Sequence, residues 1–439
     1  MQVGNTVNTA PQQKWIAAFI FCFLVLLVDG ADMLLLSYSL SSLKVEFGLS
    51  SFQAGMLGSV TLAGMAVGGI FGGWASDKFG RVRIISLSII KFSLLTALLG
   101  LVSNVYEFAI VRFLSALGLG AVYMVCAGLM SELVPTKYRT TVIATIFTGW
   151  TFGYIVASLL AGAIIPEYGW RMLFMISGSA VIIGILMPIF VKESEAWKIA
   201  RANRNQIQTK MVKGDRSVFK AIVQDKLIFR TLIFWMVVAG FMQFGYYGVN
   251  NWMPLYLEQE LGMNFKSMTN YLIGSYTAMI GGKILAGYMG DKLGRKFTFM
   301  FGAITTAIFL VIIVMFHNAS NILYLLVIFG FLYGMPLGVY TTYMSESFPT
   351  NVRGTAMGTA HNVGRIGSTI APATIGFIAT EGSIGLGFMV MGAAYLICAL
   401  PTLFIKEKMY DPQSNTVSPD EEQSSTEVKA VPLATNKAV

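Results

Sequence analysis

The sequence predicts an all-α membrane protein with twelve transmembrane helices arranged as two pseudo-symmetric six-helix bundles. Three observations lead to this fold class. Of the 439 residues, 55% are hydrophobic and only 12% are charged, about half the charged fraction of a typical soluble domain. The chain contains about twelve apolar segments, each near the roughly 20 residues that cross a hydrocarbon core. Motifs in the first half also recur in the second half at a constant spacing.

The apolar segments are too long and too uniformly apolar for the alternating strands of a barrel, so each is expected to be a helix. In chain order they are residues 15–40, 51–75, 84–102, 105–130, 141–165, 171–191, 230–256, 268–289, 297–316, 322–345, 355–379 and 385–405. A polar stretch separates six segments from six and is expected to contain an amphipathic surface helix. The predicted domains are an N-terminal bundle (1–191), a cytoplasmic linker (192–228), a C-terminal bundle (229–405) and a disordered cytoplasmic tail (406–439).

The lysines and arginines predict the orientation. If both termini are cytoplasmic, most of these 31 residues fall in inner loops and tails, and the outer loops hold only Lys44, Arg171 and Lys266. Such an inside bias is typical of multi-pass proteins of a cell inner membrane. The net charge of +9 is therefore a topology signal, and nucleic acid is excluded as a partner. The bilayer is the expected environment, and a monomer is the expected state.

Enzyme chemistry has no support in the sequence. The three cysteines lie in apolar stretches and the two histidines are far apart, so neither a disulfide framework nor a metal site is expected. No Walker loop or nucleophile constellation is present, so no cofactor is expected and ATP does not drive the protein directly.

Two motif pairs recur 214 positions apart. "GGWASDKFGR" (72–81) matches "GYMGDKLGR" (287–295), and "SELVPTKYR" (131–139) matches "SESFPTNVR" (345–353). Duplicated halves in a membrane protein favour an alternating-access transporter. The Gly-x-x-x-Asp-Lys-x-Gly-Arg pattern resembles the signature of the major facilitator superfamily, over about residues 15 to 405. This resemblance implies two bundles that rock about a central site.

A closer resemblance rests on the first and fourth spans. "DGADM" with "RFLSALGLG" is similar to the aromatic acid:proton symporter family, whose members transport benzoate, 4-hydroxybenzoate, muconate and related carboxylates. One departure is Ala116, where relatives often have glycine.

Two carboxylates interrupt the first span. Asp29 and Asp32 are spaced i, i+3 and share a helix face, and they are the only acids well inside any span. Two ionised carboxylates close together in a low dielectric are unfavourable, so at least one should hold a proton or have a cationic partner. Arg112 in the fourth span has a depth similar to that of Asp32. For the two aspartates a purely structural ion pair is the alternative, and a proton-coupling role is favoured. The resemblance links Arg112 to proton coupling, and for this residue a structural anchor and a functional switch are left equally open.

Arg365 is the candidate anion-binding residue. It lies near the middle of the eleventh span, and its repeat counterpart is Thr151, so the duplication does not require a charge there. Guanidinium binds carboxylates in a bidentate manner, which favours substrate binding over a structural tie. Aromatic and amide side chains on neighbouring spans complete the expected pocket. They are Gln243, Tyr246, Tyr247, Asn250, Trp150, Tyr154, Tyr340 and Asn362. Lys283 is left open between snorkelling, an inner gate and a second anion contact.

The repeated inner motifs are expected to form a gate. Their carboxylates should cap helix ends and pair with arginines in the outward-facing state, then separate. The residues are Gly73, Asp77, Arg81, Asp291, Arg295, Glu132, Arg139, Glu346 and Arg353.

The function predicted from the sequence is proton-coupled uptake of a small organic anion, an aromatic carboxylate or a muconate-like dicarboxylate. A drug or metabolite exporter on the same fold is an alternative, although span 5 lacks the proline of the antiporter signature. A sugar or polyol porter is another, because "ESEAW" faintly echoes a sugar-porter motif. A transporter-like sensor is weaker, since the tail contains no recognisable domain.

Overall fold

The described part of the chain is helical almost throughout. The computed structural model describes residues 15–134, 139–195, 197–198, 220, 222–318 and 320–407. The helices are α1 (Trp15–Phe47), α2 (Ser51–Phe79), α3 (Arg81–Leu99), α4 (Val105–Leu133), α5 (Arg139–Ser177), α6 (Val181–Phe190), α8 (Lys226–Leu255), α9 (Phe265–Leu293), α10 (Arg295–Phe316), α11 (Ile322–Glu346), α12 (Thr350–Glu381) and α13 (Ile384–Ala399). Short η1 (Gly178–Ala180), η2 (Tyr256–Glu260) and η3 (Leu400–Phe404) extend three of them.

The helices give twelve membrane crossings. By length and composition, nine stretches of the described chain can cross a membrane. One of them, Val142–Phe190, has 49 residues and turns at Gly169, whose φ of 74° suits a residue without Cβ, so it crosses twice. The more polar α9 and α12 pack along the length of α11 and α8 and complete the set. The predicted fold class is confirmed, and most helices run several residues past the predicted apolar limits.

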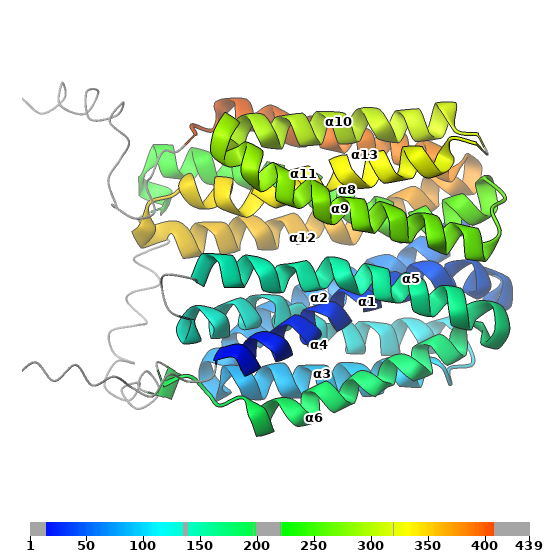
Figure 1. Ribbon diagram of the computed structural model, residues 1–439, viewed down its shortest axis with the longest axis horizontal. Helices are drawn as coiled ribbons and strands as arrows, with labels where there is room; N and C mark the ends of the chain where they lie inside the picture. Colours follow the sequence, from blue (N-terminus) through cyan, green and yellow to red (C-terminus); the bar gives the residue numbers. More distant parts are fainter. Residues whose placement is uncertain are drawn as a thin grey trace, which may run out of the picture.

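The two sets of six crossings lie side by side. In Figure 1, α1 to α6 form one group and α8 to α13 the other, and α1 begins at the same end of the bundle at which η3 finishes. We call this the inner end, and the opposite one the outer end. Within the first group α1 packs on α5 and α2 on α4, and within the second α8 packs on α12 and α9 on α11, which are the pairs that the repeat relates. The predicted domain limits stay a prediction, and most of 192–228 and of 406–439 lies outside the described residues.

Carboxylates hold equivalent helix ends in the two halves. At the inner end, Glu193 accepts hydrogen bonds from the backbone N–H groups of Arg81 (2.9 Å) and Arg83 (3.0 Å). Glu407, 214 positions later, accepts one from the N–H of Arg295. A carboxylate at a helix N-terminus satisfies free N–H groups and interacts favourably with the helix dipole. Each half therefore fixes the start of its third crossing in the same way.

At the outer end, two further glutamates at equivalent positions join helices, one through side chains and one through backbone N–H groups. Glu46 accepts hydrogen bonds from the Trp170 indole (2.6 Å) and the Arg171 guanidinium (2.5 Å). Glu260, again 214 positions later, accepts hydrogen bonds from the backbone N–H groups of Ile384 and Gly385. The first and sixth crossings of each half are thus joined at the outer end. We refer to Glu46, Glu193, Glu260 and Glu407 as the four clasps.

The two halves meet at two seams, α2 with α12 and α5 with α9, and where α1 meets α8. Close contacts lie toward the outer end of the α2–α12 seam. A Cβ on Gly55 would lie 2.4 Å from the Pro372 carbonyl oxygen, and one on Gly376 would lie 2.5 Å from that of Ser51. Toward the inner end of α12, a Cβ on Gly354 or Gly358 would meet no atom within 4 Å. Among the described residues, the α2–α12 seam is therefore closed at the outer end and open at the inner end, and we call this the outer-closed arrangement.

Candidate functional site

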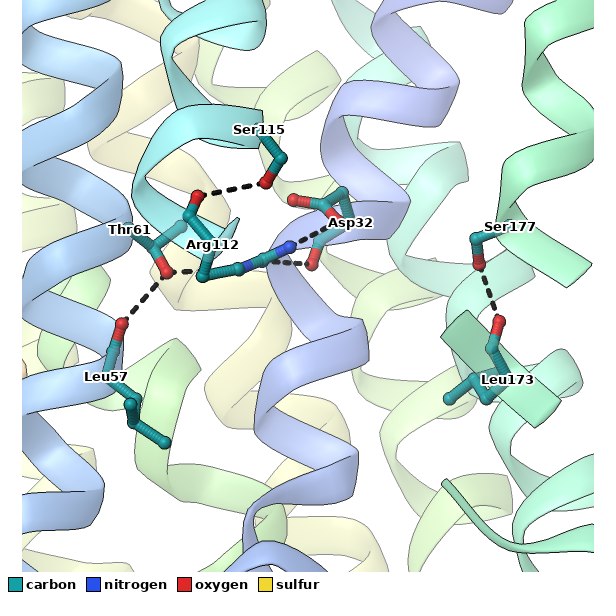
Figure 2. Close-up of polar contacts among 7 residues, drawn as sticks. All are labelled: Asp32, Leu57, Thr61, Arg112, Ser115, Leu173 and Ser177. Atoms are coloured by element: carbon teal, nitrogen blue, oxygen red, sulfur yellow. Dashed lines mark hydrogen bonds and ion pairs between the residues drawn. The ribbon is translucent and has the colours of Figure 1, made fainter. Parts of the chain in front are cut away.

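Asp32 and Arg112 form a buried ion pair between α1 and α4. Arg112 Nη1 lies 2.7 Å from Asp32 Oδ1, with the two side chains 0% and 1% exposed. The guanidinium also donates to the Asp32 carbonyl oxygen (3.1 Å) and to Thr61 Oγ1 (3.1 Å). Figure 2 shows the Arg112 side chain reaching from α4 to Asp32, with Thr61 of α2 beside it. The similar depth inferred from the sequence thus corresponds to a direct contact, while a role in proton coupling stays a prediction.

Asp29 has no such partner. Its side chain is 0% exposed, and neither carboxylate oxygen has a hydrogen-bond partner within the described part of the chain. Asp32 and Arg365 both lie within its electrostatic reach. A buried carboxylate that accepts no hydrogen bond is costly when ionised. Asp29 thus differs from Asp32 in its surroundings, and its role in proton coupling stays a prediction.

Close packing of α1 on α5 fixes the position of Asp29. A Cβ on Gly30 would lie 2.2 Å from the Trp150 carbonyl oxygen, and one on Gly153 would lie 2.2 Å from that of Leu27. Only glycines allow the two backbones to approach so closely. The resulting rotation of α1 buries both acids inside the N-terminal half rather than toward lipid.

Arg365 spans the α2–α12 seam. Its guanidinium donates to the carbonyl oxygens of Met65 (2.6 Å) and Gly120 (3.4 Å). Gly69 leaves room for it, because a Cβ there would lie 3.2 Å from Arg365 Nη1. No ion pair of Arg365 occurs among the described residues. A guanidinium held only by neutral carbonyl groups keeps its charge available for an anion.

Aromatic rings of α4 and α5 pack together near Asp29 and Arg365. Tyr123 of α4 stacks on Phe147 of α5, with ring centroids 4.3 Å apart and planes 10° apart, and meets Trp150 edge-on at 6.1 Å. Tyr123 and Tyr247 both lie within electrostatic reach of Asp29 and Arg365. An acid, a cation and stacked rings from four helices thus converge, which suits a flat, conjugated carboxylate.

A second polar layer closes the site toward the outer end. Tyr246 donates to the hydroxyl of Tyr154 across the halves (3.1 Å), and Asn250 donates to the Tyr333 hydroxyl (2.8 Å). Ser37 of α1 donates to the Asn250 carbonyl oxygen (3.1 Å). Three of the predicted substrate residues, Tyr154, Tyr246 and Asn250, therefore bind one another in this conformation.

The remaining predicted substrate residues lie on the inner side of that layer. Gln243 donates to the His361 carbonyl oxygen (3.1 Å), and the Tyr340 ring meets Trp235 edge-on at 5.8 Å. The Tyr340 hydroxyl has no partner among the described atoms. Asn362 lies with Arg365 in an open groove of about 730 Å³ between α2 and α12, whose other walls are largely apolar. Arg365 thus lies between the aromatic cluster and this groove. Whether these residues bind substrate stays a prediction.

Five of the nine predicted gate residues form ion pairs at the inner end. Arg81 pairs with Glu132 (2.8 Å), and Arg295 pairs with Asp291 (2.8 Å) and Glu346 (3.3 Å). The other four predicted gate residues are Arg353, Gly73, Asp77 and Arg139. Arg353 Nε donates to the Phe348 carbonyl oxygen (3.2 Å), a Cβ on Gly73 would meet no atom within 4 Å, and the side chains of Asp77 and Arg139 lie outside the described residues. The pairs join crossings within one half and are intact in this outer-closed arrangement, so their expected separation outside the outward-facing state is not observed.

Tyr123 and the four clasps are not among the residues predicted from the sequence. The stacking of Tyr123 on Phe147 is not expected from its position alone. Glu193 and Glu407 were not recognised as helix caps. The repeat offset could have found them, because two acids 214 positions apart flank the last crossing of each half. Metal binding has no structural support in the described chain, where no three His, Cys, Asp or Glu side chains cluster.

Twelve crossings in two repeated halves, with seams closed at one end over a central polar site, define a transporter of the alternating-access class. The family model "Major Facilitator Superfamily" matches residues 21–372 and 272–437, so the chain belongs to this family, as its motifs predicted, and is a transporter rather than an enzyme.

Relatives of stated function are similar along most of the chain. The sequence is 63% identical over 416 residues to the cis,cis-muconate transport protein of Acinetobacter baylyi, covering 94% of this chain and 100% of that one. It is 27% identical to the benzoate transport protein of the same organism, with 81% of each chain covered. Among solved structures, the inward open conformation of the xylose transporter XylE from E. coli matches with a TM-score of 0.75 at 19% identity, covering 94% of this chain and 99% of that one. This last likeness shows the fold alone.

Proposed function

We propose that the protein is a proton-coupled symporter that takes up a conjugated dicarboxylate of the muconate type. The observation that carries the proposal is the 63% identity to a cis,cis-muconate transport protein over its whole length. The site supplies a chemical reason, because it combines a cation, stacked rings and an acid without a partner. The aromatic carboxylates predicted from the sequence remain secondary substrates.

In the proposed cycle the two acids have different tasks. Arg112 neutralises Asp32 and joins α1 to α4, so the task of Asp32 is to hold these two helices in position. Asp29 takes the proton, which removes its repulsion of a substrate carboxylate near Arg365. Arg365 exchanges its carbonyl partners on Met65 and Gly120 for the substrate, and this exchange loosens the α2–α12 seam. Substrate binding and seam opening are thereby coupled through one side chain.

The proposal also includes orientation and environment. The inner end is placed in the cytoplasm, with both termini there, because the inner loops carry most of the lysine and arginine residues. The chain is placed in the cell inner membrane as a monomer surrounded by lipid. The outer-closed, inner-open arrangement is then the state that releases substrate into the cell.

The test is uptake into proteoliposomes with an inward proton gradient and the membrane potential clamped at zero. Labelled cis,cis-muconate should accumulate above its outside concentration, a protonophore should abolish accumulation, and xylose should not enter. Each pH unit supplies about 1.4 kcal/mol per proton, or roughly a tenfold gradient. No uptake of muconate or benzoate under this gradient would refute the proposal.

Asp29→Asn separates the steps. The amide mimics a protonated carboxyl group, so exchange of internal for external muconate should persist while the accumulation ratio falls to about one. Glu195→Gln, at an exposed surface acid, is the matched control and should accumulate normally. Full accumulation by Asp29→Asn would remove Asp29 from proton coupling.

A further inference from the structure

Lys283 is a charged residue that the proposed cycle does not use. It lies on α9, and its ammonium group crosses the α5–α9 seam to donate to Thr151 Oγ1 at 2.7 Å. Among the described residues this neutral hydroxyl is its one hydrogen-bond partner, and no carboxylate lies within ion-pair distance. An ammonium group has three donors, and an uncompensated charge inside a membrane protein is costly. Such a charge is expected where an anion arrives to compensate it.

The repeat relates Lys283 to the site of Arg365. Thr151 and Arg365 occupy equivalent positions, 214 residues apart, and so do Gly69 and Lys283. In the α2–α12 seam the cation comes from α12 and extends over Gly69. In the α5–α9 seam the cation stands at the other position of the equivalent pair, because Lys283 of α9 donates to Thr151 of α5. Each seam therefore holds one cation at an equivalent depth, both from the C-terminal half.

The surroundings of Lys283 connect it to the aromatic cluster. Tyr276, two turns away on the same face of α9, packs edge-on against Tyr154 at 5.1 Å. Thr151 follows Trp150 on α5, and the Trp150 and Tyr154 rings lie 6.4 Å apart. The Lys283 ammonium group is thus held on α5 one residue from Trp150, whose ring meets Tyr123 of the aromatic cluster edge-on.

The charges of the two seams match a doubly charged ligand. Asp32 and Arg112 cancel each other. With a proton on Asp29, the cations left at the seams are Arg365 and Lys283. A monocarboxylate compensates one of them, whereas a dicarboxylate with an anionic group at each end compensates both.

We propose that Lys283 is the second cation of the substrate site and that, together with Arg365, it selects dicarboxylates over monocarboxylates. This inference rests on the proposed function and deepens it. Thr151 holds the ammonium group in place while the site is empty, and one substrate carboxylate joins it when the halves close around the ligand. Arg365 binds the other carboxylate.

The test compares two ligands that differ in one carboxylate. Hexa-2,4-dienoate has the six-carbon diene chain of muconate but a single carboxylate. Equilibrium binding of both to the purified full chain in lipid nanodiscs should show muconate bound at least roughly tenfold more tightly. In Lys283→Gln the muconate affinity should fall by about tenfold with the hexadienoate affinity unchanged, while Lys283→Arg should keep the preference. Lys266→Gln, the same change at an exposed position of α9, should behave as wild type.

The outcomes separate this inference from the proposed function. Equal losses for both ligands in Lys283→Gln, or an unchanged preference, would overturn the role of Lys283 and leave anion transport intact. A wild-type protein that binds both ligands equally would do the same without any variant. A wild-type protein that binds neither would overturn both proposals. If Lys283→Gln does not fold, Thr151→Val should weaken muconate binding alone, and equal weakening of both ligands would overturn the inference.

Discussion

Removal of the Arg112 guanidinium is the perturbation with the largest expected effect on stability. In Arg112→Met the side chain keeps much of its volume but loses the guanidinium, which is 0% exposed and lies 2.7 Å from Asp32 Oδ1. It also loses the hydrogen bonds to the Asp32 carbonyl oxygen and Thr61. Breaking one partner of a buried pair leaves an uncompensated charge and costs about 3–5 kcal/mol. The charged guanidinium also donates two hydrogen bonds to uncharged acceptors, at about 1.5 kcal/mol or more each, which favours the upper part of that range.

A double-mutant cycle isolates the pair. Asp32→Asn combined with Arg112→Met removes both charges, so the double variant should be less destabilised than Arg112→Met alone, with a coupling energy of about 2 kcal/mol or more. Unfolding in mixed micelles of increasing SDS content, followed by tryptophan fluorescence, measures each free energy. Arg83→Met, at an exposed side chain, is the control and should change stability by no more than about 0.5 kcal/mol. A loss below about 1 kcal/mol in Arg112→Met, or strictly additive effects, would refute this account of the pair.

Three further changes test other parts of the structure. Gly30→Ala should lower the unfolding free energy by about 1–3 kcal/mol, because its Cβ would meet the Trp150 carbonyl oxygen at 2.2 Å. In the control Gly240→Ala the added Cβ would meet no atom within 4 Å, so the unfolding free energy should stay unchanged or rise by up to about 1 kcal/mol. Equal effects of the two substitutions would contradict this reasoning. Glu193→Gln should lower the unfolding free energy by about 1 kcal/mol in the same assay, since a neutral amide stabilises the α3 N-terminus less than a carboxylate does. An unchanged unfolding free energy would show that Glu193 does not stabilise the fold. Tyr154→Phe removes the hydroxyl that accepts from Tyr246 across the halves, and should lower the population of the outer-closed state two- to tenfold. Maleimide labelling of a cysteine placed at Gly354 should slow accordingly, Tyr168→Phe at an exposed position should have no effect, and equal labelling in both variants would contradict it.

The helices were predictable because lipid imposes their length and the repeat doubles the signal. The predicted 322–345 and 297–316 correspond to α11 at Ile322–Glu346 and α10 at Arg295–Phe316. Helices with polar ends extended further, as α12 begins at Thr350 rather than 355, because backbone hydrogen bonding continues where the apolar pattern stops.

The site was predictable in its residue types but not in its contacts. Periodicity places Asp29 and Asp32 on one face and cannot decide which of them meets Arg112. That choice follows from the rotation of α1, which the contact of Gly30 with α5 sets. The acceptors of Arg365 are backbone carbonyl groups, which no side-chain pattern marks. The repeat shows that Lys283 occupies the position equivalent to Gly69. Only the contacts across the seams show that Lys283 and Arg365 are the cations of the two seams.

The four clasps bear on the ancestry of the fold. Each joins two crossings of the same half, and none depends on the other half. A half-length precursor would already have needed them to hold its six helices together, so they belong to the architecture that was copied. Asp29, Asp32, Lys283 and Arg365 have no counterpart of the same type 214 positions away. The charged residues of the site therefore arose separately in the two copies after the duplication, whereas the glutamates that join the helix ends were retained in both.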